Sequence, residues 1–181
     1  MDKSLFSIYK LPFFISVTLA IIMLALGGVG QPIQMASVIV AAFLGMFVLD
    51  FEYVLNAYFL DTQSDFSKTL VGFVKHSDWN NALKYIYFHK DETKENSLNS
   101  ALFQMVLAFM SIFVVYATTS IFAKALILTV FAQSIYVLLE YYFKDRTDDW
   151  FWTLKVKPSK QGVHTYTFVL LLILSYCLYI F

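Results

Sequence analysis

The chain has 181 residues, of which 59% are hydrophobic and 14% charged, and its 13 Lys and Arg residues balance its 13 Asp and Glu residues. A mean hydropathy of +0.65 is too high for a soluble domain of this size. It predicts an all-α membrane protein with several spans, folded as one domain over residues 1–181. Zero net charge without a basic patch argues against a nucleic-acid partner. The single cysteine, Cys177, excludes an internal disulfide.

Five apolar stretches are long enough to cross a membrane. We expect a polytopic helical bundle with spans at about residues 11–26, 35–60, 98–117, 121–143 and 164–181. Glycine and proline in residues 27–32 predict a turn after the first span. Residues 118–120 should form a second, tight turn between the third and fourth spans.

The polar segment 61–96 separates the second and third spans. Apolar residues at helical spacing within residues 66–88 predict one or two amphipathic helices that cap the bundle or lie on the membrane surface. Ser77 or Asp78 is expected to cap the start of a helix. Residues 91–96 are expected to form a charged loop.

Aromatic residues stand beside charges in two places, residues 79–88 and residues 150–152. Tryptophan and tyrosine are typical of the membrane interface because their rings are amphipathic. We therefore expect both segments to be exposed surfaces that contact lipid or a partner protein.

Basic residues predict the orientation of the chain. With five spans, all of the 13 Lys and Arg residues except Lys124 fall on the side of the N-terminus and of the 61–96 segment. The positive-inside rule makes that side cytoplasmic. The expected location is thus a cell inner membrane, with several passes, the N-terminus inside and the C-terminus outside.

Three carboxylates lie in or at the ends of expected spans: Asp50 and Glu52 in the second, and Glu140 in the fourth. A charge in an apolar span needs a partner, a water-filled cavity or an ion. In the expected topology all three lie in the cytoplasmic half of the membrane. Because the spans hold no lysine or arginine near them, we expect a protonated carboxyl, a bound cation or water to serve as partner.

Other polar residues accompany the carboxylates. Thr129, Gln133, Tyr136 and Glu140 follow one another at intervals of four, three and four residues, which places them on one helical face. In the third span, Ser97, Gln104, Ser111 and Thr118 recur every seven residues. We expect the two faces to meet and, with the carboxylates, to line one pocket open to the cytoplasm; its further lining residues are Asn99, Ser100, Gln104, Gln133 and Tyr136. The alternative is hydrogen bonding between helices, at about 0.6 kcal/mol per contact.

His89 has two interpretations. A single loop histidine is commonly a polar surface residue, but it can also be a metal ligand that approaches the carboxylates. Imidazole with carboxylates suits zinc, manganese or iron. On this hypothesis Asp50, His89 and Glu140 bind the metal, and these three with Glu52 form the catalytic group.

These residues resemble the membrane-bound metal-dependent hydrolase-like proteins of bacteria and archaea. In that family an Asp-x-Asp-His motif ends one span, a His-Arg loop follows, a His-Ser pair opens the next span, and a later span carries His and Asp four residues apart. The corresponding residues here are Asp50, Glu52 and Tyr53, then His89 and Lys90, then Asn99 and Ser100, and finally Tyr136 and Glu140. The resemblance implies a membrane-embedded hydrolase. Tyr53, Asn99 and Tyr136 stand where the family has histidine, which favours a divergent member that has lost catalysis.

Three functions follow from these observations. The first is a metal-dependent hydrolase-like protein whose metal activates water against an ester or phosphoester. The second is a non-catalytic integral membrane protein that binds a lipid or serves as a structural subunit of a membrane complex. The third is a transporter or channel component, since carboxylates within a membrane can carry protons or cations.

Overall fold

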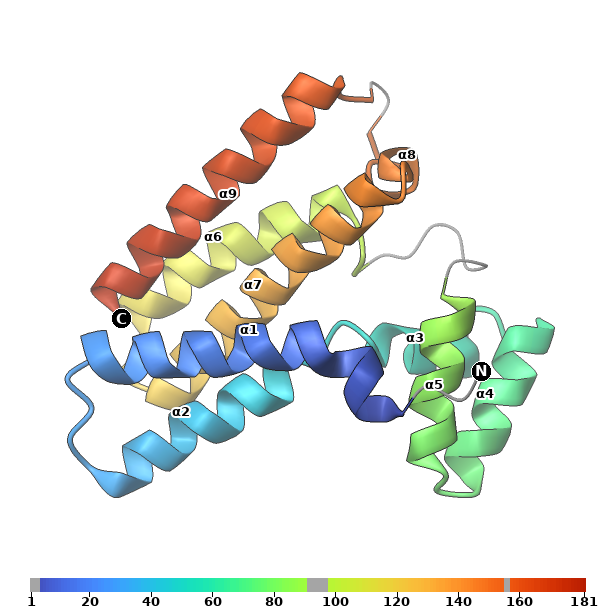
Figure 1. Cartoon of the computed structure of the whole chain (residues 1–181), viewed down its shortest axis with the longest axis horizontal. Coiled ribbons are helices and arrows are strands. Elements are labelled where there is room, and N and C mark those ends of the chain that lie inside the picture. Colours follow the sequence, from blue (N-terminus) through green and yellow to red (C-terminus); the bar gives the residue numbers. More distant parts are fainter. Residues whose placement is uncertain (1–3, 91–97, 155–156) are drawn as a thin grey trace.

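The structure, a computed structural model, describes residues 4–90, 98–154 and 157–181. Every regular element within these residues is helical, with nine α-helices and one short π-helix (Figure 1). The prediction of an all-α fold is confirmed. The expected charged loop at 91–96, together with Ser97, lies outside the described residues.

Five apolar helices form the bundle: α1 (Leu5–Leu26), α2 (Pro32–Gly45), α6 (Ala101–Ala117), α7 (Ile121–Phe143) and α9 (Lys160–Ile180). Three short helices, α3 (Phe51–Leu55), α4 (Asp65–Lys75) and α5 (Trp79–His89), together with the π-helix Asn56–Leu60, gather beside one end of this bundle (Figure 1). We call these four elements the cap. Helix α8 (Thr147–Trp150) connects α7 to α9.

Successive bundle helices run in opposite directions. The turn between α1 and α2, the turn between α6 and α7, and the C-terminus lie together at the end far from the cap (Figure 1). The close approach of Gly27 to the C-terminus agrees with this arrangement, because a Cβ atom added to Gly27 would lie only 2.8 Å from the ring of Phe181. The described connections therefore alternate between the two ends of the bundle.

Three of the described helices, α1, α7 and α9, are long and apolar enough to cross a membrane. Helices α2 and α6 are also apolar but have only 14 and 17 residues. The three longer helices are compatible with a membrane protein. The expected count of five spans is not confirmed.

The second expected span, residues 35–60, is not one continuous helix. Helix α2 ends at Gly45, residues 46–50 form turns, and the chain continues into α3 and the π-helix. Asp50 and Glu52 thus lie beyond the end of α2, in the turn and in α3. Since a charge inside an apolar span is costly, the chain leaves the bundle before its first carboxylate.

Side chains cap most of the described helices. Serines at positions 4, 64, 100, 120 and 159 each accept a hydrogen bond from a backbone N–H three residues later, as expected for N-caps. The prediction for α5 is also confirmed, since the Asp78 side chain accepts a hydrogen bond from the backbone N–H of Asn81. The expected amphipathic segment contains two helices, α4 and α5.

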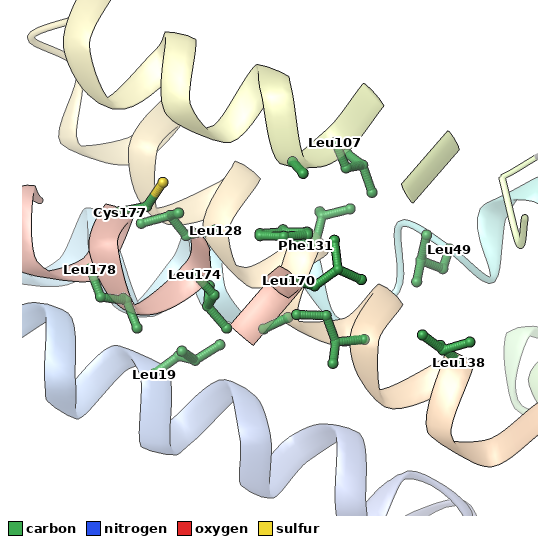
Figure 2. Close-up of a cluster of buried hydrophobic side chains, with 14 of the residues drawn as sticks. Leu19, Leu49, Leu107, Leu128, Phe131, Leu138, Leu170, Leu174, Cys177 and Leu178 are labelled. Carbon is green, nitrogen blue, oxygen red and sulfur yellow. The ribbon is translucent and has the colours of Figure 1, made fainter. Parts of the chain in front are cut away.

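The core of the bundle is made by side chains from α1, α2, α6, α7 and α9. Figure 2 shows Leu19, Phe131, Leu170 and Leu174 pointing toward one another in this core. Trp150 and Phe151 belong to the same cluster and are 0% and 2% exposed. The expectation that residues 150–152 form an exposed aromatic surface is therefore wrong for two of the three, because α8 folds its rings inward against Tyr141 and Tyr166.

The cap has a small core of its own. It consists of six buried side chains, those of Tyr53, Ala57, Phe66, Leu70, Ala82 and Ile86. They belong to α3, the π-helix, α4 and α5. The cap and the bundle are consequently packed around separate apolar clusters.

Candidate functional site

A polar pocket lies where α1, α7, the C-terminal end of α5 and the turn after α2 meet. Two carboxylates, Asp50 and Glu140, and one ammonium group, that of Lys90, line it. The space open to the centres of water molecules is about 50 Å³, which is room for a few water-sized groups. Three tyrosines complete most of its polar wall: Tyr9, Tyr87 and Tyr136.

Asp50 comes from the turn after α2 and is held by a neutral partner. The hydroxyl of Tyr9, on α1, donates a hydrogen bond of 2.7 Å to Asp50 Oδ2. Burial raises the pKa of Asp50, while the hydrogen bond from Tyr9 and the positive charge of Lys90 oppose this rise. A carboxylate in this environment is less readily ionised than one in water.

Glu140, by contrast, is held by two cations. Lys90 Nζ lies 2.8 Å from Glu140 Oε2, and Lys144 Nζ lies 3.0 Å from Oε1. The ammonium group of Lys90 also lies 5.3 Å from the ring centroid of Tyr87. The expectation that a protonated carboxyl, a bound cation or water would be the partner of Glu140 is therefore wrong, because Lys90, just beyond α5, and Lys144, just beyond α7, reach it.

Glu52 faces a different part of the molecule. Its carboxylate accepts hydrogen bonds from the backbone N–H groups of Leu98 (2.7 Å) and Asn99 (3.1 Å) and from the Asn99 side chain (3.0 Å). Ser100, the next residue, is the N-cap of α6. Glu52, Asn99 and Ser100 thus join the cap to the start of α6 and do not line the pocket.

Of the two expected glutamines, Gln133 lines the pocket and Gln104 does not. Gln104 is fully buried and bonds to Ser134 (3.2 Å) and to the indole N–H of Trp150 (3.3 Å), away from the pocket. Gln133 lines the pocket and donates to the Pro12 carbonyl (2.8 Å) and the Ser16 hydroxyl (3.0 Å) of α1. The polar face of α7 that contains Gln133 therefore meets α1, and α6 is contacted through Ser134 instead.

His89 does not reach the pocket. Its ring stacks on Tyr85 with a centroid distance of 4.2 Å, and its Nδ1 lies 3.0 Å from the Tyr85 carbonyl oxygen. Both contacts are those of residues four apart on a helix. His89 belongs to the surface of the cap.

The described residues do not fit the expected zinc, manganese or iron centre. No three His, Cys, Asp or Glu side chains among residues 4–90, 98–154 and 157–181 are close enough to hold a metal ion. Of the proposed ligands Asp50, His89 and Glu140, the first and last share the pocket. Two ammonium groups within 3.0 Å of Glu140 would repel a divalent cation.

Tyr9 and Tyr87 line the pocket but were not predicted from the sequence, and Lys90 was named only as the counterpart of an arginine in the family's motif. Tyr9 precedes the start expected for the first span, and Lys90 and Tyr87 belong to the segment expected to cap the bundle. One signal was available: Tyr87 and Lys90 are three residues apart, which places both on one face of a helix.

An apolar groove lies on the other side of Tyr136. It is lined by α1, α7 and α9, through residues such as Leu19, Ile135 and Leu171, and has a volume of about 320 Å³ by the same measure as the pocket. Phe14, 68% exposed, stands at its edge. Tyr136 lines both the polar pocket and the groove.

Comparisons with protein-family models, with curated proteins and with solved structures find no match to this chain.

Proposed function

We propose that this protein is a multi-pass integral membrane protein that binds a lipid and does not hydrolyse it. The observation that carries the proposal is the shared wall at Tyr136, where a pocket with charged side chains adjoins a groove without them. A polar group and an apolar chain at adjacent sites are the two parts of a lipid. The groove is built from α1, α7 and α9, which among the described residues are the three helices long and apolar enough to cross a membrane.

The proposal includes five spans, formed by α1, α2, α6, α7 and α9. The alternating directions of these helices support five spans. The basic residues do so as well, because Lys84, Lys144 and Arg146 lie at the cap end, whereas Lys124 lies in the first turn of α7 at the other end. This distribution makes the cap end cytoplasmic. Helix α2 would extend about 21 Å at 1.5 Å per residue, so its span also needs a locally thin membrane.

The hydrolase alternative has less support. It requires a metal ligand set, and His89 stacks on Tyr85 instead of approaching Asp50 and Glu140. Glu140 is already neutralised by lysines. A structural subunit and a transport component remain predictions from the sequence, to which no contact of the described residues adds support.

Filling the groove tests the proposal. Thr18 and the adjacent Val17 are both exposed, but only Thr18 lines the groove. A Thr18→Phe variant should therefore lose the lipid that co-purifies with the wild type, because the new ring occupies the space for the chain. Val17→Phe adds the same ring outside the groove and should retain the lipid.

The measurement is native mass spectrometry of the protein released from detergent, with the bound lipid counted per chain. We expect about one lipid on the wild type and on Val17→Phe. Equal lipid retention by Thr18→Phe, or no retained lipid on any of the three proteins, would contradict the proposal.

A further inference from the structure

We infer that the polar pocket selects a lipid whose headgroup carries a primary ammonium next to a phosphate, as in phosphoethanolamine. This inference rests on the proposed function and adds the chemistry of the headgroup. It comes from three features of the pocket: its aromatic wall, the placement of its charges and the small space that remains in it.

The wall has the composition of an ammonium site. Three tyrosines, Tyr9, Tyr87 and Tyr136, line a space that two carboxylates also line. The faces of aromatic rings attract cations, and such rings form the cages that recognise ammonium ligands. Carboxylates add charge-assisted hydrogen bonds to the same groups.

One ammonium group already occupies part of this wall. Lys90 Nζ pairs with Glu140 at 2.8 Å and lies 5.3 Å from the centroid of Tyr87. The side chain comes from the end of α5 and crosses to α7, so the lysine is held by the same kinds of group that would hold a ligand. The pocket is therefore built to stabilise a primary ammonium.

The second carboxylate offers an equivalent position. Asp50 accepts its hydrogen bond from the neutral hydroxyl of Tyr9 at 2.7 Å. Counting the charged lining residues, Asp50 and Glu140 against Lys90, the pocket carries one net negative charge when both acids are ionised. This charge favours a cation beside Asp50 and disfavours a phosphate there.

A phosphate would find its complement in Lys144, which does not line the pocket but contacts Glu140, a residue that does. Lys144 lies 3.0 Å from Glu140, and its side chain is 38% exposed. An anionic group beside Lys144, next to an ammonium beside Asp50, would place each charge of the headgroup near a side chain of opposite charge. Phosphoethanolamine carries both groups, whereas an anionic glycerol headgroup lacks the ammonium.

The size and hydrogen bonding of the ammonium group distinguish an ethanolamine lipid from a choline lipid. About 50 Å³ is open to water-sized groups. A primary ammonium donates three hydrogen bonds and fits a space of this size, whereas a trimethylammonium group is larger and donates none. We expect an ethanolamine lipid to bind about tenfold more tightly than a choline lipid with the same chains, since charge-assisted hydrogen bonds contribute at this level.

The test compares lipids with identical acyl chains and ethanolamine, choline or glycerol headgroups, titrated onto delipidated protein and followed by native mass spectrometry. Asp50→Asn keeps an oxygen that accepts from Tyr9 but removes the charge, so its affinity for the ethanolamine lipid should fall to that for the choline lipid. Asp148→Asn, which alters an exposed carboxylate outside the pocket, should keep the wild-type preference.

The outcomes separate this inference from the proposed function. Equal binding of the three lipids, or a preference for glycerol, overturns the inference; if Thr18→Phe still abolishes that binding, the proposed function stands. If no lipid binding depends on the groove, both the inference and the proposed function are overturned. The three lipids on the wild-type protein decide the question even if Asp50→Asn does not fold.

Discussion

At the scale of single residues, the two carboxylates of the pocket differ in what holds them. Asp50 accepts a hydrogen bond from Tyr9, whereas Glu140 is paired with Lys90 and Lys144. Glu52, only two residues from Asp50, does not line the pocket and accepts hydrogen bonds from the backbone before α6. Similar side chains thus serve different purposes because their neighbours come from different elements.

The raised pKa of Asp50 predicts a pH-dependent stability. A carboxyl whose pKa is higher in the folded than in the unfolded protein binds more protons when the protein is folded. Its stabilising contribution to the free energy of unfolding is therefore present in acid and is lost as the pH rises through the folded pKa. Asp50→Asn cannot ionise and keeps the acceptor for Tyr9. Above the folded pKa, the lipid-free variant should therefore melt at a higher temperature than the wild type.

Thermal melting in detergent between about pH 4 and about pH 8 measures this difference. The gap between Asp50→Asn and the wild type should widen toward the upper end, while Asp148→Asn should follow the wild type throughout. A constant gap across the range would show that ionisation of Asp50 is not its cause.

At the scale of elements, the contact of α2 with α7 depends on a glycine. A Cβ atom on Gly45 would lie 2.8 Å from the Cβ of Thr129, whose hydroxyl donates to the Ala125 carbonyl at 2.8 Å. The two helices approach this closely only because Gly45 has no side chain. The end of α2 and the polar turn that follows it are positioned by this contact.

Gly45→Ala should consequently destabilise the protein by about 1–3 kcal/mol, the usual cost of overpacking. The control is Gly72→Ala in α4, where a Cβ would meet no atom within 4 Å. This second change should stabilise the protein by about 0.4–1 kcal/mol, because alanine reduces the entropy of the unfolded chain. Equal effects of the two substitutions on the free energy of unfolding would contradict the proposed packing.

Local signals in the sequence were enough to predict α7. Its bounds, Ile121–Phe143, match the fourth expected span because an apolar run lies between a capping serine and Lys144. The interruption after Gly45 was missed because residues 46–60 are also largely apolar. That break depends on distant partners, since Tyr53 and Ala57 pack against Phe66 and Leu70 of α4.

In the candidate site, too, local spacing predicts some of the residues, whereas others depend on distant packing partners. Gln133, Tyr136 and Glu140 line the pocket because helical spacing placed them on one face. Gln104, on α6, is also polar, but it bonds to Ser134 and Trp150 and does not line the pocket. Which neighbour a helical face meets is a property of the whole packing, and spacing along one helix does not contain it.

At the scale of the whole molecule, the cap and the far end of the bundle should lie on opposite sides of the membrane. A cysteine at Thr119, in the turn between α6 and α7, and one at Thr69, on α4, test this directly, because both threonines are exposed. The background is Cys177→Ser, which removes the only cysteine. An impermeant maleimide added to intact cells should label Thr119→Cys and reach Thr69→Cys only after the membrane is opened.

Labelling of Thr69→Cys alone in intact cells would reverse the proposed orientation. Labelling of both positions, or of neither before permeabilisation, would contradict the five-span arrangement.

The separate apolar clusters of the cap and the bundle have a consequence for cooperativity. A region with few buried contacts opens locally at a lower free energy than the global unfolding. The cap core has six buried side chains, yet the cap supplies Tyr87, and the chain just beyond α5 supplies Lys90, to the wall of the pocket. Local opening of the cap would therefore move Tyr87 and Lys90 and expose Asp50 and Glu140. A molecule bound across that wall would contact both the cap and the bundle. The two apolar clusters should then unfold together when the pocket is occupied and separately when the pocket is empty.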